Sequence, residues 1–415
     1  MNPESDQYSP PYSHCPKDAV GEPIAVETVP LPTLRRKVTQ RGTPQTEPRP
    51  SGSGFWEVRN RRVAQRNKDL VGQGCVTGVG QNSNLDILRS VAVLAVFVTH
   101  AVQVIAGCRY GEHLAYGVET YSLGRIGVLI FFVHTSLVLM QSLERAATNL
   151  LGWSLIRYFY IRRAFRIYPL SFCLIFVSIV FSIPPNALGV PYIWHGARWA
   201  SSNILLIQNI TGVSPVSGPL WSLPYEAQMY LILPLLLLAL RTPRGSNGLS
   251  LIYVIGTLLS LFYPLFQYLP CFLAGVISYQ LLGTVRPRVR AWLWSPAVVG
   301  IVVLYVFIPN ANVGALKDVL ICLIVGALIP LFQQNSGAIT TVASHIAKYS
   351  YGIYLCHTPL LWLLYRKLTI PDWQRPIWLV IATGIVSWAC YHAIEHPLIQ
   401  IGTRLANRVS MKVGK

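Results

Sequence analysis

The sequence has few charged residues. Asp, Glu, Lys and Arg make up 12% of its 415 residues, whereas hydrophobic residues make up 52%. An average soluble domain has a charged fraction of about 25%. A soluble core of this size cannot bury so much apolar surface, so the composition argues against a soluble fold. Because each membrane-spanning helix needs about 20 mostly apolar residues, the repeated apolar runs indicate an integral membrane protein.

Motifs for several common chemistries are also missing. The eight Cys include no CxxC pair, so neither a disulfide framework nor a metal site is implied. There is no Gly-rich phosphate loop, no GxSxG and no HExxH, which argues against nucleotide hydrolases, α/β-hydrolases and zinc proteases. The excess of 34 Lys and Arg over 16 Asp and Glu comes without repeats or aromatic platforms, so no nucleic-acid partner is expected.

The two ends of the chain differ from its middle. Residues 1–80 are rich in Pro, Gly, Ser, Thr and Arg and lack apolar periodicity, which predicts a disordered tail. The tail has no signal-peptide core, so a cytoplasmic start is expected, unless part of it reflects a misplaced translation start. The transmembrane domain is expected over residues 84–400, followed by a short basic cytoplasmic tail at 401–415.

The apolar runs predict an all-α, polytopic bundle of about ten transmembrane helices. The expected spans are 85–107, 124–143, 167–183, 225–240, 248–264, 265–283, 291–308, 316–333, 350–365 and 377–398. With both termini in the cytoplasm, the inner segments carry 15 Lys and Arg, and the outer segments carry 7 when Arg125 and Lys317, at the outer ends of their spans, are counted with them. This bias agrees with the positive-inside rule, so we expect a multi-pass protein of the cell inner (plasma) membrane with both termini cytoplasmic.

The first expected span carries Arg89 and His100, ionisable side chains that the bilayer penalises. They are eleven residues apart, so on a helix they share one face, about 16 Å apart along the axis. This predicts a path on which an anionic reagent is held at Arg89 and reacts at His100. The structural alternative is that Arg89 reaches lipid head groups and His100 hydrogen-bonds a neighbouring helix.

Further polar residues lie at span boundaries. Arg163 and Arg166 share a helix face, which suits a phosphate or a carboxylate, or contact with anionic membrane lipid. Glu226 lies at a span entry, where it either orients an imidazole, binds acceptor hydroxyls, or simply meets water. Trp221 offers a surface for stacking a sugar, or belongs to an interfacial aromatic belt.

Two more polar residues lie within the last two expected spans. These are His357 and Glu395, which are interpreted first as polar groups in helix packing and second as parts of a catalytic site.

In this order, these elements resemble the acyltransferase 3 family of bacterial membrane-bound O-acyltransferases, from about Asn84 to Leu398. The resemblance rests on Leu85-Asp86-Ile87-Leu88-Arg89 leading to His100, Phe131-Phe132-Val133, Arg163-Ala164-Phe165-Arg166-Ile167-Tyr168-Pro169, Trp221-Ser222-Leu223 with Glu226 and Pro234, Ser350-Tyr351 with Tyr354-Leu355 and His357, and Ile394-Glu395-His396-Pro397.

The resemblance implies ten helices, an acyl-CoA donor that enters from the cytoplasm, and a carbohydrate or lipid-linked glycan acceptor. Arg89 and His100 match the family's Arg-to-His spacing, with His100 as the catalytic residue, and Arg163 and Arg166 match its donor-binding pair. No cofactor is expected beyond the donor substrate, and acetyl-CoA is the donor of first choice.

Two positions depart from the family pattern. Members often have Phe-Phe-x-x-Ser-Gly where this chain has Phe131-Phe132-Val133-His134-Thr135-Ser136, and His396 stands where an Arg is common. The first departure removes a Gly and adds an imidazole, which changes the expectation for the local backbone.

The expected function is that of an integral membrane O-acyltransferase. His100 would take the proton of an acceptor hydroxyl as this attacks the thioester, with an acyl-His intermediate as the alternative. Arg89 would lie along the donor path, and Trp221, Glu226, His357 and Glu395 would bind the acceptor or support the site. The rival functions are a transporter or flippase of a lipid-linked or small polar solute, and an assembly protein that docks through its Arg-rich tail.

Overall fold

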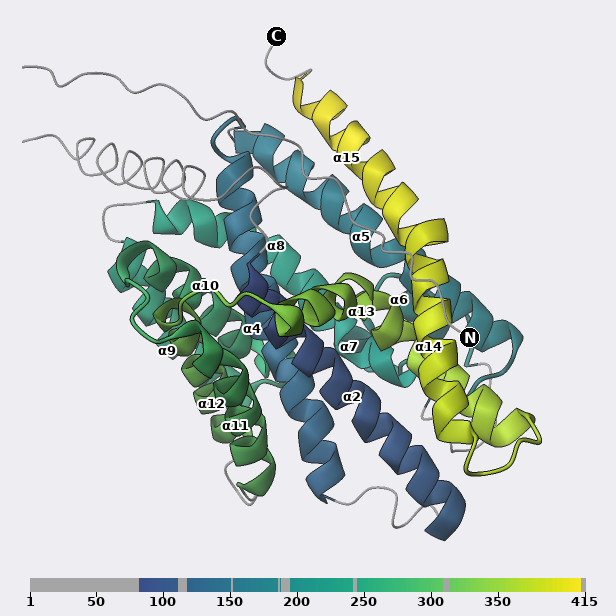
Figure 1. The fold of residues 1–415 in the computed structure, drawn as a ribbon. Helices are drawn as coiled ribbons and strands as arrows, with labels where there is room; N and C mark the ends of the chain where they lie inside the picture. The colour runs from purple at the N-terminus through teal and green to yellow at the C-terminus, as the bar shows by residue number, and fades with distance from the viewer. Residues whose placement is uncertain are drawn as a thin grey trace, which may run out of the picture. The chain divides into compact units, whose positions relative to one another are not determined.

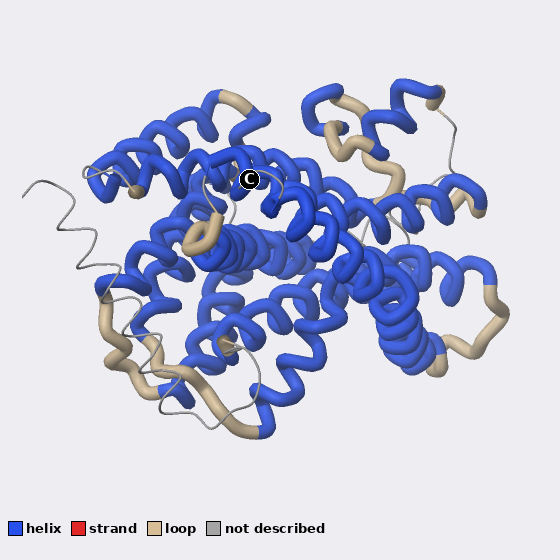
Figure 2. The backbone as a smooth tube through the Cα atoms, turned by 90° about the horizontal axis from the view of Figure 1, so that it is seen from above, coloured by secondary structure: helices blue, strands red, loops and turns tan. Residues whose placement is uncertain are grey.

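Long, mostly apolar sequences form the helices of this protein. The computed structural model describes residues 82–110, 118–150, 152–185, 187, 195–241, 245–308 and 314–411, all within the unit Phe55–Lys415. The tail predicted over residues 1–80 lies outside the described residues. The described part contains helices and no β-strand, so the predicted all-α fold class is confirmed (Figure 2).

The long helices account for most of the described chain. They are α2 (Ser83–Tyr110), α4 (Val118–Ala146), α5 (Gly152–Val180), α8 (Leu223–Leu240), α9 (Gly245–Phe262), α10 (Leu269–Thr284), α11 (Trp294–Phe307), α12 (Gly314–Leu328), α13 (Ala338–Trp362), α14 (Arg375–Cys390) and α15 (His396–Met411). Shorter α-helices are α6 (Ala197–Ile204) and α7 (Gln208–Thr211). Single 3₁₀ turns occur at Gly218–Trp221, Pro264–Phe266, Ala291–Leu293 and Ile329–Leu331, and π-helical turns at Leu363–Lys367 and Tyr391–Glu395.

Six helical stretches are long and apolar enough to cross a membrane. They are Ser83–Cys108, Tyr121–Ala146, Gly152–Val180, Gly218–Leu240, Pro264–Thr284 and Arg375–Val409. Two shorter apolar helices cover Gly248–Phe262 and Ala291–Phe307. The expectation of a multi-pass membrane protein is therefore confirmed, whereas the number of ten crossings stays a prediction.

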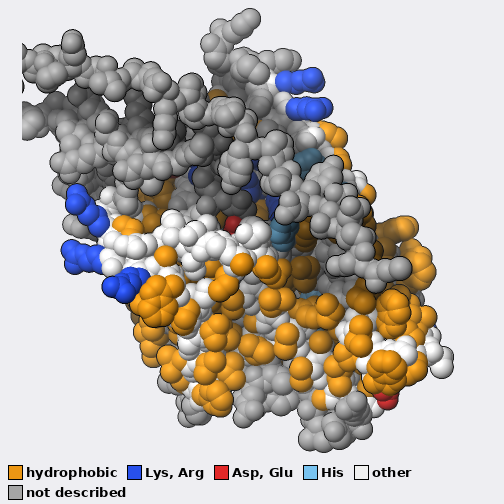
Figure 3. All heavy atoms as spheres, viewed as in Figure 1, with side chains coloured by type: hydrophobic (Ala, Val, Ile, Leu, Met, Phe, Trp, Pro, Cys, Tyr) orange, Lys and Arg blue, Asp and Glu red, His pale blue; other side chains and the backbone are white. Residues whose placement is uncertain are grey.

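The surface fits a lipid environment. Phe176, Phe262 and Phe307 are between 68% and 75% exposed, which costs free energy in water but none in lipid. In Figure 3, hydrophobic side chains cover the middle and lower part of the face, and visible Lys and Arg side chains gather toward its upper part. The visible basic side chains on this face thus lie apart from most of its apolar surface.

The helices pack in three groups. α2 packs along both α4 and α13, α10 packs against α4, α9 and α12, and α15 lies along α5 (Figure 1). The stretch Arg375–Val409 has 35 residues and would be about 52 Å long as a continuous helix, beyond the roughly 30 Å of a hydrocarbon core. Because this stretch is longer than the hydrocarbon core, its α15 end and the part of α5 packed against it can extend beyond that core.

Helix α5 begins earlier than the predicted span at 167–183. It starts at Gly152 because the segment rich in Arg and aromatic residues continues the helix on the N-terminal side of the apolar run. Pro169 lies inside α5 and removes one backbone donor without ending the helix. The early start places Arg163 and Arg166 on a rigid helix rather than in a loop.

A buried ion pair ties α4 to α12. Arg125 donates from Nε to Oδ2 of Asp318 at 2.9 Å, and the hydroxyl of Tyr305 on α11 donates to Oδ1. Asp318 is 3% exposed, so its charge depends on these donors for compensation. Sequence reasoning did not single out Asp318, because the Arg with which it pairs is almost 200 positions away.

Glycine lets α2 and α4 approach closely. A Cβ added at Gly127 would lie 2.6 Å from the backbone oxygen of Ala92 and 2.9 Å from Val96. Small residues at such crossings replace the hydrophobic driving force that is missing between helices in lipid. A Cβ added at Gly300 on α11 would have no neighbouring heavy atom within 4 Å.

We expect Gly127→Ala to destabilise the protein by about 1–3 kcal/mol, because the added methyl group forces the two backbones apart. Gly300→Ala is the matched control and should be neutral or slightly stabilising, since Ala favours a helix and the site is open. The measurement is the thermal midpoint of the detergent-solubilised protein. Equal midpoints for the two variants would contradict the close packing of α2 on α4.

Candidate active site

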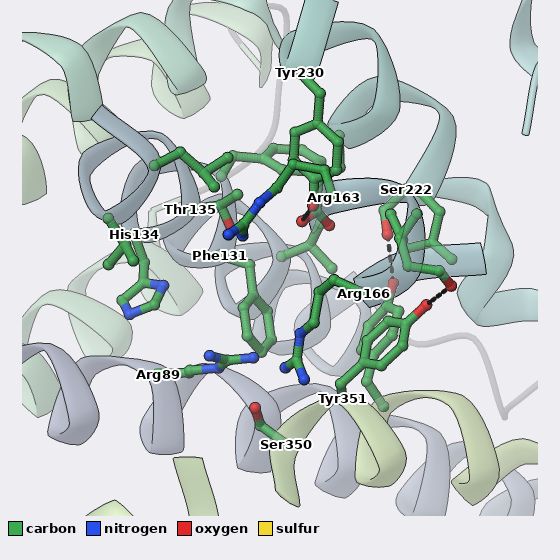
Figure 4. Close-up of a pocket in the computed structure, with 18 residues that line it drawn as sticks. Arg89, Phe131, His134, Thr135, Arg163, Arg166, Ser222, Tyr230, Ser350 and Tyr351 are labelled. Atoms are coloured by element: carbon green, nitrogen blue, oxygen red, sulfur yellow. Dashed lines mark hydrogen bonds between the residues drawn. The ribbon is translucent and has the colours of Figure 1, made fainter. Parts of the chain in front are cut away.

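Three arginines from two helices surround one cavity. Arg89 comes from α2, and Arg163 and Arg166 come from α5. The cavity measures about 110 Å³ and is also lined by residues of α4, α8 and α13. Figure 4 shows the three guanidinium groups turned toward a shared space beside Phe131. The structure therefore brings together all three residues that the sequence assigned to an anionic reagent.

The guanidinium groups around this cavity are only partly hydrogen-bonded. Glu395 is 2% exposed and accepts a hydrogen bond from Nη1 of Arg166 at 2.7 Å. It lies in the π-helical turn Tyr391–Glu395, a local geometry that is frequent at functional sites. The Nε atoms of Arg89 and Arg163 are buried and have no hydrogen-bond partner among the described residues.

Glu226 lies in the same cavity as the arginines. Its carboxylate accepts a hydrogen bond of 2.5 Å from the hydroxyl of Tyr230, one turn further along α8. Within the described residues it makes no hydrogen bond to His100, the imidazole that it was suggested to orient. The carboxylate instead adds one negative charge to a wall that carries three cations.

A second cavity adjoins the first at Arg89 and Arg166, which line both. It measures about 470 Å³, and its wall includes the exposed side chains of His345 and Lys348. Because these residues are exposed, the second cavity reaches the surface of the described part. Arg89 and Arg166 therefore stand between the first cavity and this second one, which we call the vestibule.

His100 lines neither cavity and contacts His357. The two residues come from α2 and α13, and Nδ1 of His100 is 3.2 Å from Nε2 of His357. His357 is 1% exposed, whereas His100 is partly exposed. Tyr354, one turn before His357 on α13, lines the cavity and has its ring centroid 6.3 Å from that of His357.

A third imidazole was noted in the sequence only as a departure from a pattern. His134 on α4 is 5% exposed and lines the cavity together with the arginines. Phe131, Thr135 and Val138 of the same helix line it as well. These positions follow the i, i+3, i+4, i+7 spacing of one helix face, which was the signal available in the sequence.

Trp221 lies in an aromatic cluster outside both cavities. Its ring packs against Tyr225 and Tyr268, with centroids 6.4 and 5.5 Å away, and it does not line either cavity. The guanidinium of Arg125 lies 5.7 Å from the centroid of Tyr268. Trp221 therefore belongs to an aromatic cluster next to the buried ion pair of α4 and α12.

Comparison with known proteins agrees with this geometry. Residues 82–393 match the acyltransferase 3 family model, described as an acyltransferase domain. The chain is also 27% identical over 371 residues to the peptidoglycan O-acetyltransferase OatA of Listeria monocytogenes. That alignment covers 77% of this chain and 56% of the relative, so the chain spans little more than half the length of the relative.

No solved structure matches the chain. The family match covers most of the sequence, including the helices that carry the three arginines and both contacting histidines. The chain therefore belongs to the acyltransferase 3 family.

Proposed function

We propose that this protein is a membrane O-acyltransferase that moves an acyl group from acyl-CoA to a hydroxyl of a glycan or lipid-linked glycan. The observation that carries the proposal is the convergence of Arg89, Arg163 and Arg166 on one cavity. Tyr354 on the wall of that cavity packs against His357, which in turn contacts His100. The name of the Listeria relative supports an acetyl group as the cargo and peptidoglycan as one kind of acceptor.

The charge of the cavity suits the donor. Coenzyme A carries phosphate groups at one end and a thioester at the end of a long flexible arm. Guanidinium groups bind phosphate with charge-assisted hydrogen bonds, and the unpartnered Nε atoms of Arg89 and Arg163 are donors available for it. His100 lies eleven residues along α2 from Arg89, about 16 Å, which the arm of the donor can span.

The proposed topology has ten crossings with both termini in the cytoplasm. Each of the ten predicted spans overlaps a helix of the described part, including four that are too short or too polar to count on their own. The vestibule at Arg89 and Arg166 then faces the cytoplasm, where acyl-CoA is made. If the protein lies in the cell membrane, the acceptor glycan lies on the side of the membrane opposite the cytoplasm.

The proposed reaction uses His100 as a general base. Nε2 of His100 takes the proton of the acceptor hydroxyl while its oxygen attacks the thioester carbonyl carbon. The C–S bond then breaks, and the CoA sulfur leaves with the proton returned from His100. The products are the acylated acceptor and free CoA thiol, and the imidazole ends in its starting state.

Replacing His100 by Ala should lower acyl transfer about 100-fold or more, because general bases contribute factors of that order. The assay incubates membranes with labelled acetyl-CoA and measures both CoA thiol release and acyl ester on surface glycans. The protein should remain inserted in the membrane in its usual amount.

His396→Ala is the matched control, since His396 is an exposed histidine whose Nε2 pairs with Gln400 on the same helix. This variant should keep its activity. A His100→Ala variant with unchanged thiol release would rule out the proposed base, and solute movement without any thiol release would favour a transporter.

Replacing Arg163 by Gln should raise the KM for acyl-CoA about tenfold or more and change kcat much less. The physical reason is the loss of one charge-assisted hydrogen bond to a donor phosphate. Arg162→Gln provides the control, because Arg162 neighbours Arg163 on α5 but pairs with the hydroxyl of Tyr158 at 2.9 Å and does not line the cavity. Equal KM values for the two variants would show that the cavity does not hold the donor phosphates.

A further inference from the structure

The backbone contacts of His100 and His357 indicate which nitrogen of each ring carries a hydrogen. Nδ1 of His100 lies 3.0 Å from the backbone oxygen of Val96, and Nδ1 of His357 lies 3.0 Å from that of Ile353. A carbonyl oxygen can only accept, so in the neutral rings both Nδ1 atoms are donors. Both Nε2 atoms therefore carry lone pairs.

This assignment gives the inter-ring hydrogen bond a direction. His100 donates from Nδ1 to Nε2 of His357 over 3.2 Å, sharing the same hydrogen with Val96. The ring centroids are 5.0 Å apart at an interplanar angle of 49°. Among the described residues, nothing hydrogen-bonds Nε2 of His100, so this lone pair stays free.

The ring of His357 is itself held on several sides. Phe97 meets it edge to face with centroids 6.3 Å apart, and Tyr354 packs against it at the same distance. The Tyr354 hydroxyl donates to the backbone oxygen of Pro219 at 2.9 Å and lies 2.6 Å from Oγ of Ser222. A series of contacts thus runs from Ser222 at the cavity wall through Tyr354 and His357 to His100.

We propose that His357 is the positioning residue of His100. Its Nε2 accepts the Nδ1 hydrogen of His100, which holds the His100 ring in the tautomer whose Nε2 lone pair is free to take a proton from the acceptor. When that proton arrives, the inter-ring bond becomes charge-assisted and stabilises the imidazolium. His357 thereby fills with a neutral imidazole the place that a carboxylate takes in many catalytic triads.

This inference rests on the proposed function, because it assigns a role to a partner of the proposed base. The family resemblance named His357 only as part of a shared stretch, and packing between helices was the first interpretation of its role. The geometry instead gives both of its ring nitrogens a partner. Glu226 and Glu395, two carboxylates near the arginines, accept hydrogen bonds from Tyr230 and Arg166 instead.

The test replaces His357 by Leu, Gln and Asn in the full-length protein in membranes. Leu fills part of the space but cannot accept a hydrogen bond, so kcat for acyl transfer should fall roughly 10- to 100-fold with the KM for acetyl-CoA unchanged. Gln places a carbonyl oxygen close to the position of Nε2 and should restore much of kcat. Asn is too short to reach His100 and should resemble Leu.

A merely structural role of His357 predicts a different result for the three variants. Leu, Gln and Asn would then lower the amount and thermal midpoint of the protein together, with KM and kcat following the folded fraction. If the Leu variant does not fold, the Gln and Asn variants still decide, since they differ in reach and not in polarity. Equal kcat for Gln and Asn would overturn the proposal.

The His100→Ala background separates this inference from the function on which it rests. Adding His357→Leu to His100→Ala should cause no further loss, because the positioned ring is already absent. Full activity of His100→Ala alone would reject the proposed base. An inactive His100→Ala combined with a fully active His357→Leu would reject only the role of His357.

Discussion

A guanidinium group within a lipid-embedded helix bundle needs either a counter-charge or a polar space, because hydrocarbon solvates neither its charge nor its donors. Arg89, Arg163 and Arg166 meet this constraint together around a single cavity. Glu226 lines that cavity, and Glu395 reaches it through its ion pair with Arg166. Asp86 lines the adjoining cavity together with Arg89 and Arg166. The Nε atoms of Arg89 and Arg163 still have no hydrogen-bond partner among the described residues, so they are donors that an anionic ligand can use. The packing of α2, α5 and α13 around this charged space decides where every other part of the site lies.

The same helices connect the charged space to the histidines. α2 carries Arg89 at one end and His100 about three turns further on, and α13 carries Tyr354 on the cavity wall one turn before His357. Because α2 and α13 pack along each other, the position of Arg89 relative to the two imidazoles is fixed by one helix pair. Close approach of α4 at Gly127 holds α2 from its other side, which makes a small residue there part of the same arrangement.

The helical membrane fold and part of the candidate site could be predicted from the sequence, because apolar runs and helix periodicity are local signals. Apolar runs indicated the helical membrane fold, and helix periodicity placed Arg89 with His100 and Arg163 with Arg166. Contacts between distant segments could not be predicted in this way. The pairing of His100 with His357 and of Arg125 with Asp318 depends on which helices become neighbours, and periodicity within one helix carries no information about that.

The central claim is that the donor phosphates lie at the arginines while the acyl group reaches His100. The most direct measurement is a structure of the full-length protein in a lipid environment with a non-reactive analogue of acetyl-CoA. The account predicts phosphate oxygens within hydrogen-bond distance of Arg89, Arg163 or Arg166 and the acyl carbonyl beside Nε2 of His100. A donor bound away from these arginines, or an acyl group that ends far from His100, would contradict it.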